Sequence, residues 1–213
     1  MIEYWESSSA KLIQATVQHI ELSLTALFIA MGISTLVTLF LLFNPRFQTS
    51  SVYFLSLIYA VPSFALFALL IPLTGLGSTT AILVLIIYAQ YMLVRTFLAG
   101  FKQVDSNLVE AARGMGMTDW QIFSKIQLPL AKSSIFAGIK LATISIVAIA
   151  TIASTINAGG LGTILFDGLR TNSLPKLVWG IALTVAVSLL LTLIISLIEI
   201  LFHKEYENQF QTE

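Results

Sequence analysis

Cysteine is absent from this chain of 213 residues, and charged residues make up only 10% of it. The lack of cysteine excludes disulfide bonds, thiol catalysis and cysteine-based metal sites. Lysine plus arginine number eleven, as do aspartate plus glutamate, so the net charge favours neither nucleic acid nor a strongly acidic substrate as a partner. Apolar residues reach 57%, against about 45–50% in ordinary soluble domains. The composition therefore indicates a membrane protein.

The chain also lacks the common motifs of enzymes. It contains no GxxxxGK[ST] loop to hold phosphates, no HExxH metal motif and no GxSxG nucleophile motif. The two histidines, His19 and His203, lie near opposite ends of the chain, and we interpret each as a residue at the membrane interface. We therefore expect no enzymatic activity, no metal site and no cofactor in this chain.

Long apolar runs predict an all-α, polytopic membrane protein with one domain over residues 1–213. A membrane span needs about 20 apolar residues. Five runs of suitable length lie at about residues 20–43, 52–73, 77–99, 135–156 and 177–202. No cleaved signal peptide is expected, and the residues before the first run are interpreted as a short interfacial lead-in. A sixth span remains open if the N-terminus or residues 157–176 insert.

Two short features modify these runs. Pro62 lies inside the second run and predicts a kink that packs in the bundle interior, because a proline frees a backbone carbonyl that neighbouring helices must satisfy. Residues 157–176 contain four glycines and predict turns around a short, half-buried helix. Three of these glycines have two open interpretations, an outer gate or close helix packing: Gly159, Gly160 and Gly162.

The longest polar interruption covers residues 100–133, which we call the elbow. It is too long for an ordinary connection and predicts two short helices. Asp105 is suited to cap the first helix, and Gly116 to end it with a positive φ. Thr118–Gln121 has the pattern of a capping box that starts the second helix. Pro129 is expected to end that helix by forcing the preceding residue out of helical conformation.

The distribution of basic residues predicts the orientation. With the N-terminus outside, cytoplasmic segments hold six lysines and arginines and outer segments hold three, which satisfies the positive-inside rule. This places the C-terminus and the elbow in the cytoplasm. The ionisable residues nearest the bilayer interior are Arg95, Lys140 and Glu199, and we expect them to snorkel or to form an ion pair among themselves.

Seven residues of the elbow have a fixed spacing: Glu110, Ala111, Ala112, Gly116, Ile126, Leu128 and Pro129. Three residues separate Ala112 from Gly116, and nine separate Gly116 from Ile126. One residue then separates Ile126 from the Leu128-Pro129 pair. This spacing resembles the EAA loop of bacterial ABC importer permeases, the cytoplasmic segment that docks onto an ATP-hydrolysing subunit. The resemblance assigns all seven residues to ATPase coupling. The alternative is an amphipathic hairpin lying in the headgroups, with Trp120 as an anchor.

The resemblance extends to VPSFALFALLIPLTGLG in 61–77, VDSNLVEAARGMGMTDWQIF in 104–123, LPLAKSSIFAGIK in 128–140 and AGGLG in 158–162. These segments are similar to permeases of importers for the osmoprotectants glycine betaine, carnitine or choline. The resemblance implies a location in the bacterial cytoplasmic membrane. It implies a second permease chain, identical or similar, two ATP-binding subunits that carry ATP and magnesium, and an external substrate-binding protein, which this chain does not include.

The cargo and its path remain open at this point. Candidate path residues are Tyr59, Pro62, Tyr88, Tyr91, Asn157, Gly159 and Gly160. The tyrosine rings either meet a methylated cation, at roughly 0.5–2 kcal/mol each, or pack against neighbouring helices. The sequence departs from the family before Arg95, where a proline is common, and at Asn157, where glycine is usual. Alternatives are an importer of an amino acid or a thiolated betaine, or an ATP-independent channel or scaffold.

Overall fold

The computed structural model describes the backbone of residues 2–211 and the side chains of residues 3–202, and this part of the chain contains helices and no strand. The main helices are α1 (Ile2–Phe43), α2 (Gln48–Ala60), α3 (Ser63–Thr74), α4 (Ser78–Lys102), α5 (Ser106–Gly114), α6 (Asp119–Ile122), α7 (Leu128–Ala153), α8 (Gly162–Arg170) and α9 (Leu174–Gln211). Short 3-10 turns occupy Pro45–Phe47 and Ser154–Ile156, and a π-helical turn occupies Phe123–Gln127. The predicted all-α class is confirmed.

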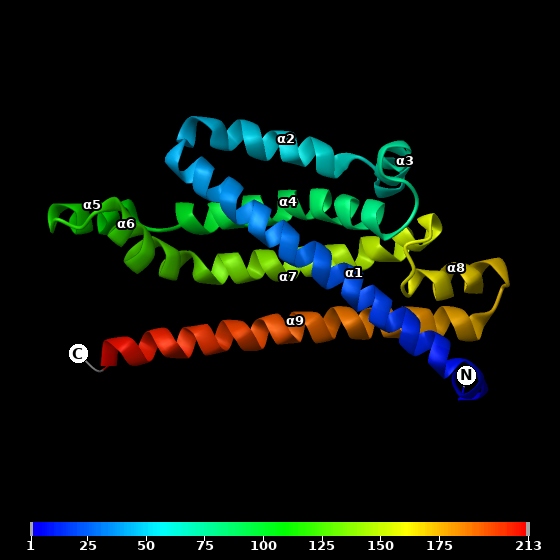
Figure 1. Ribbon diagram of the computed structural model, residues 1–213. Coiled ribbons are helices and arrows are strands. Elements are labelled where there is room, and N and C mark those ends of the chain that lie inside the picture. Colours follow the sequence, from blue (N-terminus) through cyan, green and yellow to red (C-terminus); the bar gives the residue numbers. More distant parts are fainter. Residues whose placement is uncertain (1, 212–213) are drawn as a thin grey trace.

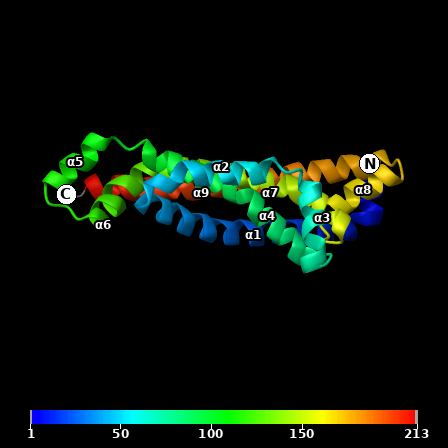
Figure 2. The same cartoon turned by 90° about the horizontal axis from the view of Figure 1, so that it is seen from above.

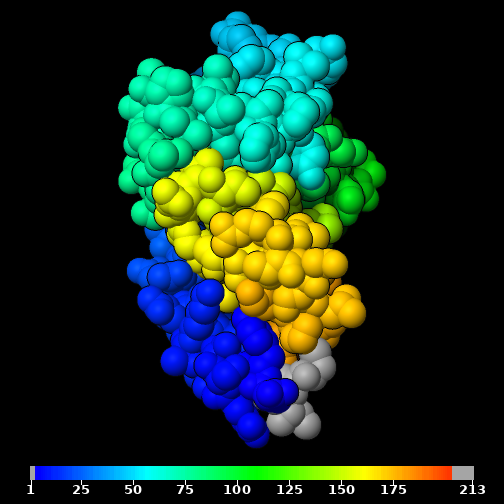
Figure 3. Space-filling view, turned by 90° about the vertical axis from the view of Figure 1, so that its right-hand side faces the viewer, coloured from blue at the N-terminus to red at the C-terminus, as the bar shows by residue number. Residues whose placement is uncertain are grey.

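Helices α4, α7 and α9 run lengthwise in one bundle, and α1 crosses them obliquely (Figure 1). α5 and α6 project from one end, and α8 lies at the other, near the N-terminus. Figure 2 shows α1 along one face of the bundle, outside α4 and α7. Figure 3 looks onto the end that carries α8, where α8 lies between the start of α1 and the α2–α3 region. The elbow is thus at the opposite end from the glycine-rich segment.

Helix α4 is the centre of the core. One cluster of buried side chains joins α1, α4 and α7 through Ala30, Leu93 and Ile146. The apolar stretch of α4 is 56% buried and that of α9 only 11%. An outer helix whose apolar side chains remain exposed suits a lipid environment, where no water penalises them.

Four helices of the described chain are long and apolar enough to cross a membrane: Glu3–Phe43, Ser78–Lys102, Asp119–Ile156 and Leu174–Phe202. A fifth span results if the bent pair α2 and α3 counts as one. The run predicted at 52–73 is therefore not one straight helix. Its two halves have 13 and 12 residues and meet at 93°. Each half is about 20 Å long, shorter than the hydrocarbon core of about 30 Å.

The break between α2 and α3 has a local cause. Val61 is extended, with φ −63° and ψ 132°, because the ring of the following proline disfavours helical conformation. The Tyr88 hydroxyl donates a hydrogen bond to the Val61 carbonyl. The predicted bend at Pro62 is confirmed, but its predicted place in the bundle interior is wrong, since Pro62 is exposed in this chain.

The N-terminal lead-in predicted before residue 20 is instead part of α1. Leu12 and Ala15 are 0% and 5% exposed and pack with Val147 and Leu161. His19 lies on the same face and is fully buried, so its predicted interfacial position is wrong. Its Nε2 atom lies 3.1 Å from the Val147 carbonyl oxygen. The other histidine, His203, lies outside the residues whose side chains the structure describes.

Candidate functional site: the elbow and the helices behind it

The caps of the elbow agree with the sequence patterns. Asp105 accepts a hydrogen bond from the Asn107 backbone N–H at 2.9 Å and starts α5. Gly116 has φ +84° and carries the chain into the next turn. The Thr118 N–H donates to Oε1 of Gln121 at 2.8 Å, and the Gln121 N–H donates to the Thr118 hydroxyl at 3.3 Å. This reciprocal capping box starts α6.

An ion pair also spans the turn. The Arg113 guanidinium lies 3.0 Å from a carboxylate oxygen of Asp119, and both side chains are largely exposed. Exposed pairs of this kind contribute about 0–1 kcal/mol, so the pair adds little to the fold of the elbow. The caps and the glycine therefore set its shape.

The predicted end of the second short helix at Pro129 is wrong. The backbone continues in helical conformation from α6 through the π-helical turn into α7, and Leu128 has φ −63° and ψ −46°. The Leu128 N–H donates to the carbonyl of Phe123, five residues back. A proline clashes with the carbonyl four residues before it in an α-helix. The wider π turn accommodates Pro129 without ending the helix.

Three of the seven predicted coupling residues lie on α5, and four lie in the turn and helix that follow it. Glu110 and Ala111 are exposed on α5, whereas Ala112, next in sequence, is 1% exposed. Its carbonyl accepts a hydrogen bond from the Met117 N–H at 3.1 Å, which folds the turn back onto α5. The other four lie at the turn and in the following helical segment: Gly116, Ile126, Leu128 and Pro129. The elbow thus presents Glu110 to solvent and uses the small residue Ala112 for its inner packing.

Large apolar side chains on the elbow are exposed as well. Leu108 is 50%, Met115 is 76% and Trp120 is 68% exposed. Exposed aromatic and methionine side chains are enriched at protein interfaces. Sequence analysis assigned Leu108 and Met115 no role. The signal for Met115 was its position in a turn, where a polar residue is the ordinary choice.

Aromatic rings connect the elbow to α4. Phe101, near the end of α4, stacks on Phe123 with ring centroids 5.6 Å apart. Phe123 also stacks on Trp120 at 5.5 Å. The exposed tryptophan is therefore connected, through the ring of Phe123, to the helix that leads into the elbow.

Helices α4 and α7 approach each other closely just behind the elbow. A methyl group added at Gly138 of α7 would lie 1.9 Å from Oγ1 of Thr96 on α4. One added at Gly100 would lie 2.8 Å from Cβ of Ser134. Only glycine fits at these crossings, and small residues let membrane helices pack backbone to backbone. The two helices that flank the elbow are thus held together as a pair.

The tyrosines predicted for the path lie together where α2 meets α3. The ring of Tyr59 lies edge-on to the ring of Tyr88, with centroids 5.7 Å apart. The centroids of the Tyr59 and Tyr91 rings are 5.1 Å apart. Pro62 follows Val61, whose carbonyl bonds Tyr88. The Arg95 guanidinium donates to the Tyr91 hydroxyl at 2.6 Å. The rings pack against one another in this structure.

The other predicted path residues lie at the end away from the elbow, where Gly159 and Gly160 contact α1. Asn157 has φ +63°, and the Gly160 N–H donates to Oε1 of Gln18 at 3.2 Å. A methyl group at Gly159 would lie 2.7 Å from that same oxygen. These distances are those of close packing between the glycine-rich segment and α1, and the interpretation as an outer gate stays a prediction. The predicted half-buried helix after them is α8. The contact with Gln18 had no sequence signal, since 142 residues separate the partners.

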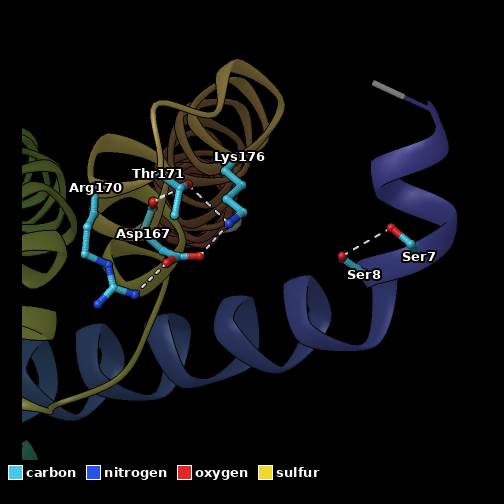
Figure 4. A network of polar contacts seen from close by, with 6 residues as sticks. All are labelled: Ser7, Ser8, Asp167, Arg170, Thr171 and Lys176. Atoms are coloured by element: carbon cyan, nitrogen blue, oxygen red, sulfur yellow. Dashed lines mark hydrogen bonds and ion pairs between the residues drawn. The ribbon is translucent and has the colours of Figure 1, made fainter.

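A polar network fixes the turn between α8 and α9 (Figure 4). The Lys176 ammonium lies 2.8 Å from Oδ2 of Asp167, and the Arg170 guanidinium lies 2.9 Å from Oδ1. Hydrogen bonds from Lys176 and then from Arg170 lower the pKa of Asp167 to about 2. The Thr171 hydroxyl donates to the Asp167 backbone carbonyl at 2.7 Å. The carboxylate of Asp167 thus holds two neighbouring side chains, and its backbone carbonyl holds a third.

Comparison with known proteins now assigns the family. The family model described as "Binding-protein-dependent transport system inner membrane component" matches residues 23–206. The chain belongs to this family. It is a multi-pass inner membrane permease of the ABC importer class. The exposed elbow and the paired helices behind it are features of that permease.

The permease is 35% identical to the carnitine transport permease protein OpuCB of Listeria monocytogenes, over 88% of this chain and 85% of that protein. It is 32% identical to the glycine betaine/carnitine/choline permease protein OpuCB of Bacillus subtilis (strain 168), over 88% and 86%. An inward-facing structure of the MetNI methionine ABC transporter matches with a TM-score of 0.81 and 21% identity, covering 91% of this chain and 97% of the other. That last likeness concerns the fold.

Proposed function

We propose that the permease imports a small zwitterionic or cationic osmoprotectant, such as glycine betaine, carnitine or choline. The observation that carries this proposal is the 35% identity to a carnitine permease over nearly the whole length of both chains. The tyrosine cluster at the α2–α3 break supports it, since aromatic rings attract methylated cations. A transport path must also release its solute. Rings that pack on one another before and after the solute passes would bind it only weakly.

Import in this proposal is driven by two ATP-binding subunits that dock on the elbows of two permease chains, identical or similar. Glu110 supplies charge at the contact, and the exposed Met115 and Trp120 supply apolar area. The elbow is then cytoplasmic and the N-terminus external, in agreement with the distribution of basic residues. Solute arrives from an external binding protein, at the end that carries α8.

The mechanism is alternating access. ATP binding draws the two partner subunits together, and each carries an elbow with it. Because Trp120, Phe123 and Phe101 stack in series, and Gly138 packs directly on Thr96, movement of the elbow displaces α4 and α7 together. The bundle opens outward to receive solute, and hydrolysis resets it.

Purification from the native membrane tests the ATPase contact. A tagged chain isolated in mild detergent should bring an ATP-binding subunit with it, and Glu110→Lys should abolish that recovery. The matched control is Glu3→Lys, which reverses an exposed acidic residue at the far end of the chain. Recovery of the permease alone, under conditions that preserve a known importer, would contradict the proposal and favour a channel or scaffold.

Uptake measurements test the cargo separately. Cells that carry the full assembly should accumulate labelled carnitine, glycine betaine or choline, and depletion of ATP should stop the uptake. If the ATPase is recovered but another solute is taken up, the importer mechanism stands and the cargo assignment fails. Accumulation that continues without ATP contradicts both.

A further inference from the structure

A groove of about 460 Å³ lies between α2 and α4 on the elbow half of the bundle. Its α4 wall follows one helix face, from Tyr91 through Arg95 to Lys102. Its α2 wall carries the hydroxyls of Thr49 and Ser56. None of the residues assigned to the ATPase contact lines the groove, and of the candidate path residues it includes Tyr91.

The charge of the groove is entirely positive. Arg95 and Lys102 are two helical turns apart on α4, about 10 Å, so both long side chains can reach one bound group. None of the residues that line the groove is acidic. In the described part of the chain, neither side chain forms an ion pair, and Arg95 donates only to the Tyr91 hydroxyl. Two neighbouring cations without a carboxylate favour an anionic ligand.

The groove lies towards one end of α4, which is long and apolar enough to cross a membrane. Lys102 ends α4 and Arg95 lies about 10 Å further along it, so both would lie near the headgroups when α4 spans the bilayer. The adjoining face of α2 is apolar and exposed, with Tyr53 at 65% and Phe54 at 62%. A phosphate in the groove would thus continue into acyl chains along α2, which a free anion does not supply.

We propose that this groove binds the phosphate headgroup of an anionic phospholipid. Arg95 and Lys102 neutralise the phosphate, the hydroxyls of Thr49 and Ser56 contact the glycerol region, and the acyl chains lie along Tyr53 and Phe54. Basic pockets between membrane helices on the cytoplasmic side commonly bind anionic headgroups. Phosphatidylcholine is disfavoured, because its trimethylammonium group would approach two cations. The proposed orientation, with the elbow in the cytoplasm, decides only which leaflet supplies the lipid.

Native mass spectrometry of the purified assembly tests the site. The assembly is offered an equimolar mixture of phosphatidylglycerol and phosphatidylcholine, and retained lipids are counted. Phosphatidylglycerol should be retained preferentially, and Arg95→Gln and Lys102→Gln should each weaken its binding about fivefold, or about 25-fold together. The control pair Arg46→Gln with Lys125→Gln removes equal charge at the same end, outside the groove, and should leave retention unchanged.

Three results would overturn the proposal: equal retention of the two lipids, retention that survives the double change, or displacement of the lipid by inorganic phosphate at equal concentration. Loss of permease pairing in the double variant with unchanged lipid retention would assign the groove to a second permease chain instead. Because retention is measured without transport or ATP, these outcomes do not depend on the proposed cargo.

A second measurement avoids removing the cations. The chain has no cysteine, so Ser56→Cys gives a unique thiol in the groove for a fluorescent label. Phosphatidylglycerol with a spin label near the top of an acyl chain should quench that fluorophore more than equally labelled phosphatidylcholine does. Equal quenching by both lipids would contradict a headgroup site.

Discussion

The Nζ atom of Lys140 lies 2.8 Å from Oε2 of Glu199 and joins α7 to α9. The two side chains are 27% and 19% exposed, so the pair is largely withdrawn from solvent. Both residues stand in otherwise apolar helical stretches. The pair therefore offsets two charges that would each be costly alone in a membrane.

Removing one partner should destabilise the permease more than removing both. Glu199→Leu leaves the Lys140 ammonium without its carboxylate and should cost about 1–3 kcal/mol, below the range for fully buried pairs because this pair is partly exposed. Combining it with Lys140→Met should restore most of that stability. Thermal unfolding in detergent measures both, and a double variant as unstable as the single one would contradict the argument.

Gly138→Ala should force α4 and α7 apart. The added methyl group would lie 1.9 Å from Oγ1 and 2.9 Å from Cβ of Thr96, and moving the hydroxyl relieves only the first contact. We expect a loss of about 1–3 kcal/mol and reduced uptake. Gly32→Ala is the matched control, because nothing lies within 4 Å of its added methyl group. Equal stability of the two variants would show that the close crossing does not limit the fold.

Gly116→Ala should loosen the elbow without any clash. No atom lies within 4 Å of the added methyl group, so the cost comes only from φ +84° and amounts to about 1–2 kcal/mol. Gly116→Asn should cost less, since asparagine tolerates this conformation. Gly114→Ala, helical and equally open, is the control. Hydrogen exchange of the elbow and recovery of the ATPase subunit are the measurements, and identical results for the two alanine variants would refute this role.

Acid should weaken the turn between α8 and α9. The pKa of Asp167 is lowered from 3.8 to about 2 in the folded protein, so the unfolded chain takes up a proton at a higher pH than the folded chain does. The stability contributed by this carboxylate is complete above about pH 4 and is lost as the pH falls towards 2. Asp167→Asn should remove this part of the acid sensitivity. Local hydrogen exchange between about pH 5 and pH 2.5 tests it, and an unchanged pH dependence in the variant would contradict it.

Local chemistry made much of the elbow predictable. The caps at Asp105 and Thr118 and the positive φ of Gly116 depend on neighbours within a few residues, which the sequence displays directly. The prediction at Pro129 was wrong because a proline normally disfavours helical conformation in the residue before it. The hydrogen bond from the Leu128 N–H to the Phe123 carbonyl, which keeps the helix continuous, cannot be read from the sequence. An ion pair was expected among Arg95, Lys140 and Glu199, and the structure forms it between Lys140 and Glu199. Arg95 donates a hydrogen bond to the Tyr91 hydroxyl instead.

Long-range packing was less predictable. His19 follows a polar N-terminal segment, and only the fold reveals that its face of α1 is buried against Val147. The spans were found from apolar length alone, but the 93° angle between α2 and α3 depends on what surrounds Pro62. The sequence shows which residues are apolar, but only the tertiary contacts show which of them pack against protein.

The π-helical turn at Phe123–Gln127 gives the elbow a mechanical property. Since it lets the helix pass Pro129 unbroken, Asp119–Ile156 forms one rod of 38 residues, about 57 Å long and nearly twice the hydrocarbon thickness. The helix thus exceeds the hydrocarbon thickness by about 27 Å, so the end that carries Trp120 can extend beyond the bilayer by nearly the length of the part within it. A force on Trp120 therefore exerts a torque along the whole of α7, and α5 is joined to this long helix through the short turn around Gly116.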